Sequence, residues 1–106
     1  MTTPDFRHVG PPDFHDGRVL QVSQPAPDQV HVRVQGSEGH LYLVRFDQVH
    51  AVRAVRPENM LLYALTEFRD SDGTVRFVFS NWDDEDEATL EIVAPTVQID
   101  EEGVAA

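Results

Sequence analysis

Apolar and polar residues alternate with a period of two near the middle of the chain, which is the pattern of a half-buried β-strand. Val30, Val32 and Val34 occupy every second position there, and polar residues fill the positions between them. The segment 36–39 (GSEG) is rich in turn-forming residues, and residues 40–46 then return as an apolar partner strand. The pattern therefore predicts an antiparallel hairpin.

Shorter apolar runs predict further strands on both sides of this hairpin. The segment 70–73 (DSDG) is a strong hairpin turn, and we expect Gly73 to adopt a left-handed conformation there. The apolar residues of segment 49–55 are three positions apart, which fits a short extended piece or a helical turn. The remaining predicted strands are residues 18–23, 74–80, 88–93 and 97–99.

Residues 58–69 have a different spacing. Met60, Leu61, Ala64, Leu65 and Phe68 fall at helical intervals, and most of the residues around them are good helix formers. We therefore expect an α+β fold, a predominantly antiparallel sheet with one short helix over 58–69. The alternative is an all-β fold in which this segment forms one arm of a long hairpin.

A chain of 106 residues is the length of one domain. Residues 1–17 contain three prolines and two glycines, so we expect an irregular lead-in. Residues 18–99 hold all the predicted strands and form a single β-rich domain. Residues 100–106 are acidic and end in small residues, which predicts a flexible acidic tail.

The charge balance restricts the class of partner. The chain has 19 acidic residues against 8 basic ones, a net charge of −11, and all the basic residues are Arg. Because such a chain repels phosphate backbones, we expect no nucleic acid and favour a basic protein or a cation as partner. The absence of Cys excludes disulfides and zinc–thiolate sites. No signal peptide or membrane-spanning apolar run is visible, so we expect a cytoplasmic protein.

The most distinctive segment is the acidic run at residues 83–87 (DDEDE), which directly follows Trp82, the only tryptophan. An aromatic residue beside charges has the composition of an interface hot spot, and we take the segment as the candidate partner-binding site. The run can also be interpreted as a solvated acidic turn or as a weak cation site. It lacks the ligand spacing of an EF-hand cation site. The candidate residues are Trp82, Asp83, Asp84, Glu85, Asp86 and Glu87.

The sequence offers little for catalysis. His15 and Asp16 could form half of a catalytic constellation, but no Cys exists and no Ser lies in a nucleophile elbow. A turn stabilised by the Asp16 side chain is the simpler interpretation. A metal held between His31 and His40 across the hairpin would lack a third ligand. We therefore expect no enzyme, no metal site and no cofactor.

Four segments carry a resemblance: residues 14–19 (FHDGRV), 46–49 (FDQV), 81–82 (NW) and 90–94 (LEIVA). Together they resemble a loose group of small bacterial β-rich proteins, some of which are similar to immunity proteins encoded beside polymorphic toxins. The resemblance covers roughly residues 14–99 and implies a binding role without catalytic residues.

Two functional hypotheses follow from these observations. The first is a non-enzymatic, immunity-like interaction protein that binds a basic protein partner through its acidic C-terminal third. The alternative is a small-ligand or cation-binding module. Because residues 40–46 and 74–80 are apolar on both faces, we also expect a homodimer that buries the second face.

Overall fold

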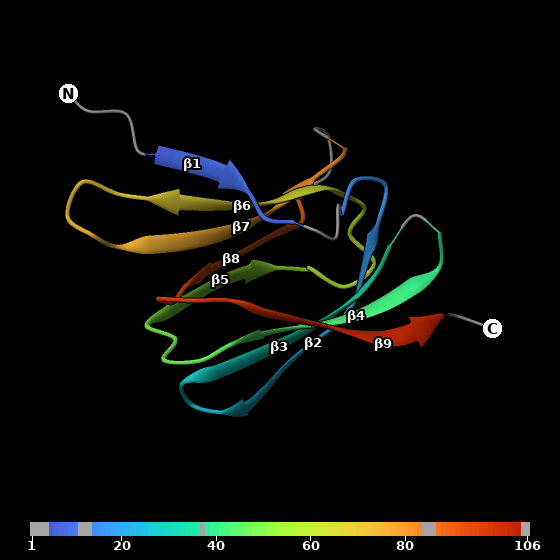
Figure 1. Ribbon diagram of the computed structural model, residues 1–106, viewed down its shortest axis with the longest axis horizontal. Helices are drawn as coiled ribbons and strands as arrows, with labels where there is room; N and C mark the ends of the chain where they lie inside the picture. Colours follow the sequence, from blue (N-terminus) through green and yellow to red (C-terminus); the bar gives the residue numbers. More distant parts are fainter. Residues whose placement is uncertain (1–4, 11–13, 37, 84–86, 105–106) are drawn as a thin grey trace.

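The computed structural model describes residues 5–10, 14–36, 38–83 and 87–104, and these form nine strands in two antiparallel sheets (Figure 1). One sheet has the strand order β1-β6-β7-β8-β5, and the other has the order β2-β3-β4-β9. The strands are β1 (Asp5–His8), β2 (Arg18–Ala26), β3 (Gln29–Gln35), β4 (His40–Phe46), β5 (Ala51–Val55), β6 (Leu62–Arg69), β7 (Val75–Asn81), β8 (Thr89–Val93) and β9 (Gln98–Val104).

The central hairpin is confirmed. β3 and β4 pair antiparallel, with Val32 opposite Val44 and Val34 opposite Tyr42. The three alternating valines of β3 are buried, while Arg33 between them is exposed. The period of two in the sequence therefore separates an inner face from an outer face, as expected for a sheet with one wet side.

The two sheets share one hydrophobic core, so the described residues form a single domain. Phe46 of β4 lies between the sheets, and its ring centroid is 5.2 Å from that of Phe77 and 6.1 Å from that of Phe79, both on β7. All three side chains are almost completely buried. These aromatic contacts join the inner face of one sheet to the inner face of the other.

The helix expected over residues 58–69 is wrong, and the all-β alternative is the observed fold. Residues 62–69 form β6, which is hydrogen-bonded between β1 and β7. The pairing with β7 is shifted between Leu62 and Ala64, so Tyr63 is the extra residue of a bulge. The bulge lets Leu62, Ala64 and Leu65 all be buried, and this breaks the period of two and imitates helical spacing.

Among the described residues no helix is long and apolar enough to cross a membrane.

The acidic C-terminal segment also differs from expectation. The sequence predicts a flexible acidic tail over residues 100–106, but residues 100–104 continue β9, which pairs with β4. Arg45 of β4 holds Asp100 through a contact of 2.6 Å, and Arg33 of β3 forms an ion pair with Glu102. Cross-strand pairs of opposite charge thus compensate the acidic residues and allow the strand to form.

The N-terminal segment is likewise more regular than expected. Residues 5–8 form β1 at the edge of the five-stranded sheet, paired with β6. Arg7 forms a two-pronged hydrogen bond with Glu67 of β6, with distances of 3.1 and 3.2 Å.

Residues 49–55 are extended and not helical, since they contain the edge strand β5.

The turn between β6 and β7 has the geometry that the sequence predicts. Gly73 has φ of +89°, and its amide donates to the carbonyl of Asp70 at 3.0 Å. The Asp72 carboxylate accepts a hydrogen bond of 2.9 Å from the amide of Thr74, which lowers the pKa of Asp72. A side chain at position 73 would meet open space, so only the backbone conformation selects glycine there.

We therefore expect Gly73→Val to lower the free energy of unfolding by about 1–3 kcal/mol, because a β-branched residue is strained at this φ. Gly73→Asn is the matched control, since Asn tolerates the left-handed region and should cost less. Urea denaturation of both variants measures the difference. Equal stability of the two would show that backbone strain does not govern this turn.

Candidate binding site

Trp82 follows β7 directly, and its side chain is 52% exposed. Its backbone is fixed, because its amide donates a hydrogen bond of 2.9 Å to the carbonyl of Leu61. The next residue, Asp83, donates its amide to the side chain of Asn81 at 2.8 Å. The structure thus places a large aromatic side chain on the surface at a rigid point of the backbone.

Two further rings surround Trp82. The Tyr63 ring is stacked on it, with an interplanar angle of 13° and a centroid distance of 5.8 Å. The His15 ring stands edge-on to both, with centroid distances of 5.4 Å to each. We call His15, Tyr63 and Trp82 the aromatic cluster. Tyr63 is 47% exposed, so the cluster presents a substantial aromatic surface to solvent.

His15 is positioned by a tight turn over residues 14–17. Phe14 buries its ring in the core, in an edge-on contact of 5.7 Å with Tyr42. Asp16 has φ of +64°, and the amide of Gly17 closes the turn on the carbonyl of Phe14 at 2.9 Å. A Cβ at position 17 would lie 2.8 Å from the carbonyl oxygen of Gln35, so this close approach requires glycine.

The same turn is hydrogen-bonded to the segment that leads into β6. The amide of Asp16 donates to the carbonyl of Leu62 at 3.0 Å, and the amide of Leu62 donates to Gly17 at 2.8 Å. Each residue of the aromatic cluster therefore either forms a backbone hydrogen bond with Leu61 or Leu62 or is the direct neighbour of a residue that forms one. Rings held in this way lose little conformational entropy when a partner binds.

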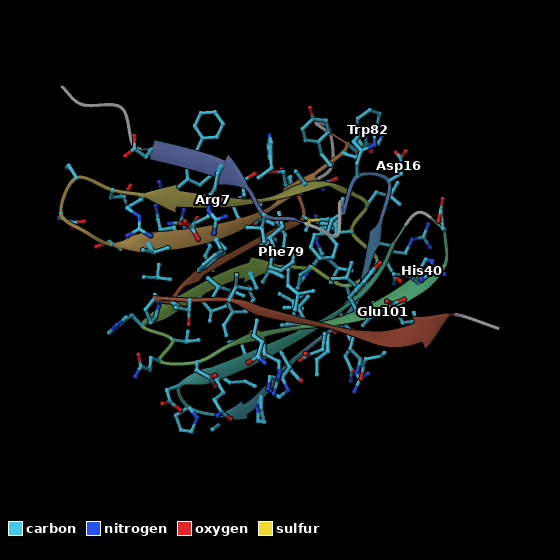
Figure 2. All side chains as sticks on the ribbon, viewed as in Figure 1. Arg7, Asp16, His40, Phe79, Trp82 and Glu101 are labelled. Atoms are coloured by element: carbon cyan, nitrogen blue, oxygen red, sulfur yellow. The ribbon has the colours of Figure 1, made fainter. Side chains whose placement is uncertain are left out.

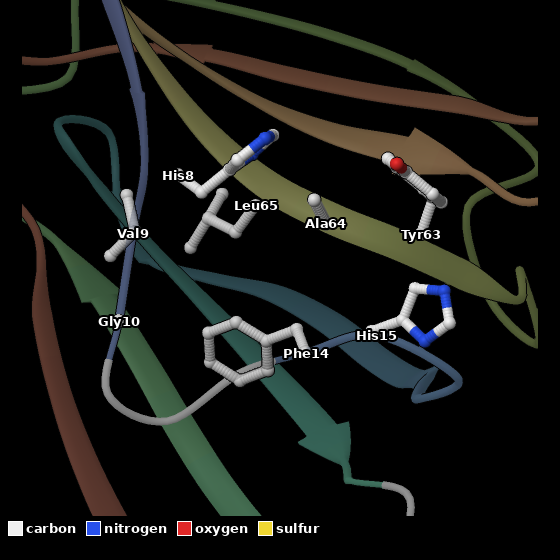
Figure 3. Close-up of a pocket in the computed structure, with 8 residues that line it drawn as sticks. All are labelled: His8, Val9, Gly10, Phe14, His15, Tyr63, Ala64 and Leu65. Atoms are coloured by element: carbon white, nitrogen blue, oxygen red, sulfur yellow. The ribbon is translucent and has the colours of Figure 1, made fainter.

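A pocket of about 460 Å³ lies beside the cluster (Figure 3). His15 and Tyr63 stand at one side of it, while Phe14 and Leu65 supply apolar walls. The ring of His8 also lines it and lies 3.2 Å from the hydroxyl of Thr66, which is buried. The pocket combines apolar walls with two imidazoles, a lining that suits a small organic group.

Carboxylates flank the cluster. Asp16 is largely exposed, its Oδ2 lies 3.2 Å from Nδ1 of His15, and Figure 2 places it at the same end of the molecule as Trp82. Asp83 follows Trp82 directly, and the exposed Glu87 comes a few residues later. The other three candidate residues, Asp84, Glu85 and Asp86, lie outside the described residues.

The positive charges are largely engaged elsewhere. Arg33 and Arg45 compensate the acidic residues of β9, as described above, and Arg7 and Arg69 both contact Glu67. Arg76 binds Asp70 and Glu91 on the five-stranded sheet. Most of the basic residues therefore neutralise carboxylates of the sheets, away from the aromatic cluster.

His15 and Asp16 are in contact, but no Ser, Cys or carboxylate is among the residues that line the pocket. The described residues contain no group of three His, Asp or Glu side chains that could hold a metal ion. His31 and His40 are apart, since His31 lies opposite Arg45 and His40 contacts Glu101 at 2.7 Å.

Sequence reasoning identified Trp82 but missed Tyr63 and His15 as parts of its surroundings. Tyr63 was placed in a helix, and His15 was assigned to an isolated turn. The signal that could have found Tyr63 is the pair of apolar residues on either side of it, 61–62 (LL) and 64–65 (AL), which fits a bulged strand as well as a helix.

A comparison of the chain with protein-family models, with curated proteins and with solved structures finds no match.

We expect Trp82→Ala to lower the free energy of unfolding by at most about 1.5 kcal/mol, because the side chain is half exposed and loses only its ring contacts. The control is Phe77→Ala, which empties a fully buried site and should cost about 3–5 kcal/mol. Chemical denaturation compares the two. If Trp82→Ala were as damaging as Phe77→Ala, Trp82 would be a core residue and not a binding residue.

Proposed function

We propose that this chain is a non-enzymatic, immunity-like interaction protein that binds a basic protein partner in the cytoplasm. The aromatic cluster and its flanking carboxylates, Asp16, Asp83 and Glu87, are the binding surface. The observation that carries the proposal is the position of Trp82, half exposed, stacked on Tyr63 and followed directly by the acidic run.

The aromatic cluster has the properties of an interface centre. Hot spots are enriched in Trp and Tyr, which supply a large contact area at a small entropic cost. Here Tyr63 and Trp82 are each about half exposed while their mutual stacking fixes their orientation. Burial of the exposed halves by a partner would remove apolar surface from water without requiring the rings to reorganise.

The charge favours a basic partner over other macromolecules. The net charge of −11 repels nucleic acids, and it attracts a positively charged protein over a distance set by the ionic strength. The run at residues 83–87 holds five carboxylates and no basic residue, and it follows Trp82 directly in the sequence. The resemblance to immunity proteins fits this role, since such proteins act by binding another protein.

The pocket of about 460 Å³ favours a second candidate, a small-ligand module that acts as a homodimer. Its volume suits a small organic molecule, and imidazoles could orient such a ligand. Support for the dimer comes from the edge strand β5, where Val52 and Val55 remain exposed.

For the basic-partner proposal, neutralisation of the five carboxylates at 83–87 to Asn and Gln should slow association several-fold and flatten its salt dependence. Folding should be nearly unchanged. Trp82→Ala should instead speed dissociation, by about 2 kcal/mol for a hot-spot residue. The partner is first recovered by pull-down and identified by mass spectrometry, and surface plasmon resonance with the purified partner then gives the rates.

The charge control is Asp28→Asn with Asp47→Asn, and the rates are compared per carboxylate removed, because the control removes two and the neutralised run five. Asp28 lies at the turn between β2 and β3, and Asp47 directly follows β4. The turn between β2 and β3 is at the opposite end of the molecule from Trp82 (Figures 1 and 2). The control substitutions should change the association rate much less than the neutralised run. If the variant with the neutralised run associated with the partner at an unchanged rate, the acidic segment would be only a solvated turn and not part of the binding surface.

The second candidate predicts a particle of twice 12.0 kDa at tens of micromolar, measured by light scattering. It also predicts that a small molecule found in a thermal-shift screen raises the melting temperature, and that His8→Leu abolishes this shift. A monomeric mass together with a screen without stabilising compounds would eliminate this candidate.

A further inference from the structure

We propose that the Tyr63–Trp82 pair binds an arginine side chain of the basic partner and distinguishes arginine from lysine. This inference rests on the proposed function, because it names the chemical group that the aromatic cluster recognises. It follows from the ring geometry, from the neighbouring carboxylates and from an equivalent contact inside the same molecule.

The ring geometry suits a planar cation. Tyr63 and Trp82 are stacked within 13° of parallel and each is about half exposed, so the stack presents an aromatic surface to solvent. A guanidinium group is planar and stacks on such a surface, whereas an ammonium group is a compact, strongly hydrated point charge. The edge-on ring of His15 contacts both members and fixes the orientation of this surface.

The carboxylates supply the second half of the recognition. Asp16 is joined to the cluster through His15, and Asp83 is joined to it through the backbone of Trp82. An arginine presents five N–H donors in a fixed fork, so it can stack on a ring and donate to a carboxylate at the edge of that ring at the same time. A lysine in the same place has to give up one of these interactions.

The protein already contains this mode of recognition. The guanidinium carbon of Arg76 lies 5.1 Å from the centroid of the Phe68 ring. Its Nε and Nη2 donate to the two oxygens of Asp70 at 3.0 and 3.2 Å, and its Nη1 donates to Glu91 at 3.3 Å. An aromatic face bordered by carboxylates thus binds arginine within the sheet. At the aromatic cluster the arginine would come from the partner.

The test uses the full chain and three synthetic peptides that are identical except for the repeated residue, which is arginine, lysine or citrulline. Trp82 is the only tryptophan, so its indole fluorescence and its indole N–H resonance report on this site alone. We expect the arginine peptide to bind at least about threefold more tightly than the lysine peptide. The uncharged citrulline peptide should produce no saturable change.

Two variants test which residues cause the preference for arginine over lysine. Tyr63→Ala and Asp16→Asn should each reduce the ratio of arginine to lysine affinity towards one, as measured by the anisotropy of labelled peptides. Phe6→Ala is the matched control, because Phe6 is also an exposed aromatic residue but contacts His8 and Phe68 instead of the cluster. It should leave the ratio unchanged.

The outcomes separate the two proposals. Equal binding of the arginine and lysine peptides would overturn the arginine inference and leave a basic partner in place. A preference for the arginine peptide that persists in Tyr63→Ala and in Asp16→Asn would also overturn the inference, because the arginine would then bind at another site. If neither charged peptide perturbs the indole, the basic-partner function itself fails along with the inference.

Discussion

A short backbone seam between residues 16–19 and 59–62 holds the two sheets and the candidate site together. Four hydrogen bonds cross it, with lengths of 2.7 to 3.0 Å, and they link the start of β2 in one sheet to the approach of β6 in the other. The carbonyl of Leu61, in the same segment, also accepts a hydrogen bond from the amide of Trp82. Main-chain bonds position the backbone that carries all three rings, and the contacts among the rings then fix their orientation.

The core and the seam have different consequences for function. Phe46, Phe77 and Phe79 hold the inner faces of the sheets together, and a change there acts on the stability of the whole domain. The seam acts locally, since Gly17 has no room for a side chain and Asp16 adopts a positive φ. Strained and tightly approached backbone of this kind is stable only where the surrounding structure enforces it, and here it orients His15 towards Tyr63 and Trp82.

The sequence predicted those elements whose signals are local. The alternating valines of β3, the return strand β4 and the positive φ of Gly73 were all readable, because each depends on neighbouring residues. The bulge at Tyr63 shifted the burial pattern and imitated a helix, and compensation of β9 by Arg33 and Arg45 depends on contacts distant in sequence. For the same reason Trp82 could be singled out from its acidic neighbours, whereas its contacts with His15 and Tyr63 could not.

The long-range ion pairs also show that much of the negative charge in the C-terminal third is paired within the sheets. Nine carboxylates follow Arg76 in the sequence, which suggested one continuous acidic surface. In the structure Glu91, Asp100 and Glu102 are held by arginines, and Glu101 contacts His40. These four serve the internal pairing of the sheets. Along the sequence, the carboxylates without intervening arginines are therefore densest at residues 83–87, which directly follow Trp82. Under the proposed function, carboxylates such as Asp16 and Asp83 would steer a basic partner towards the rings that hold the complex.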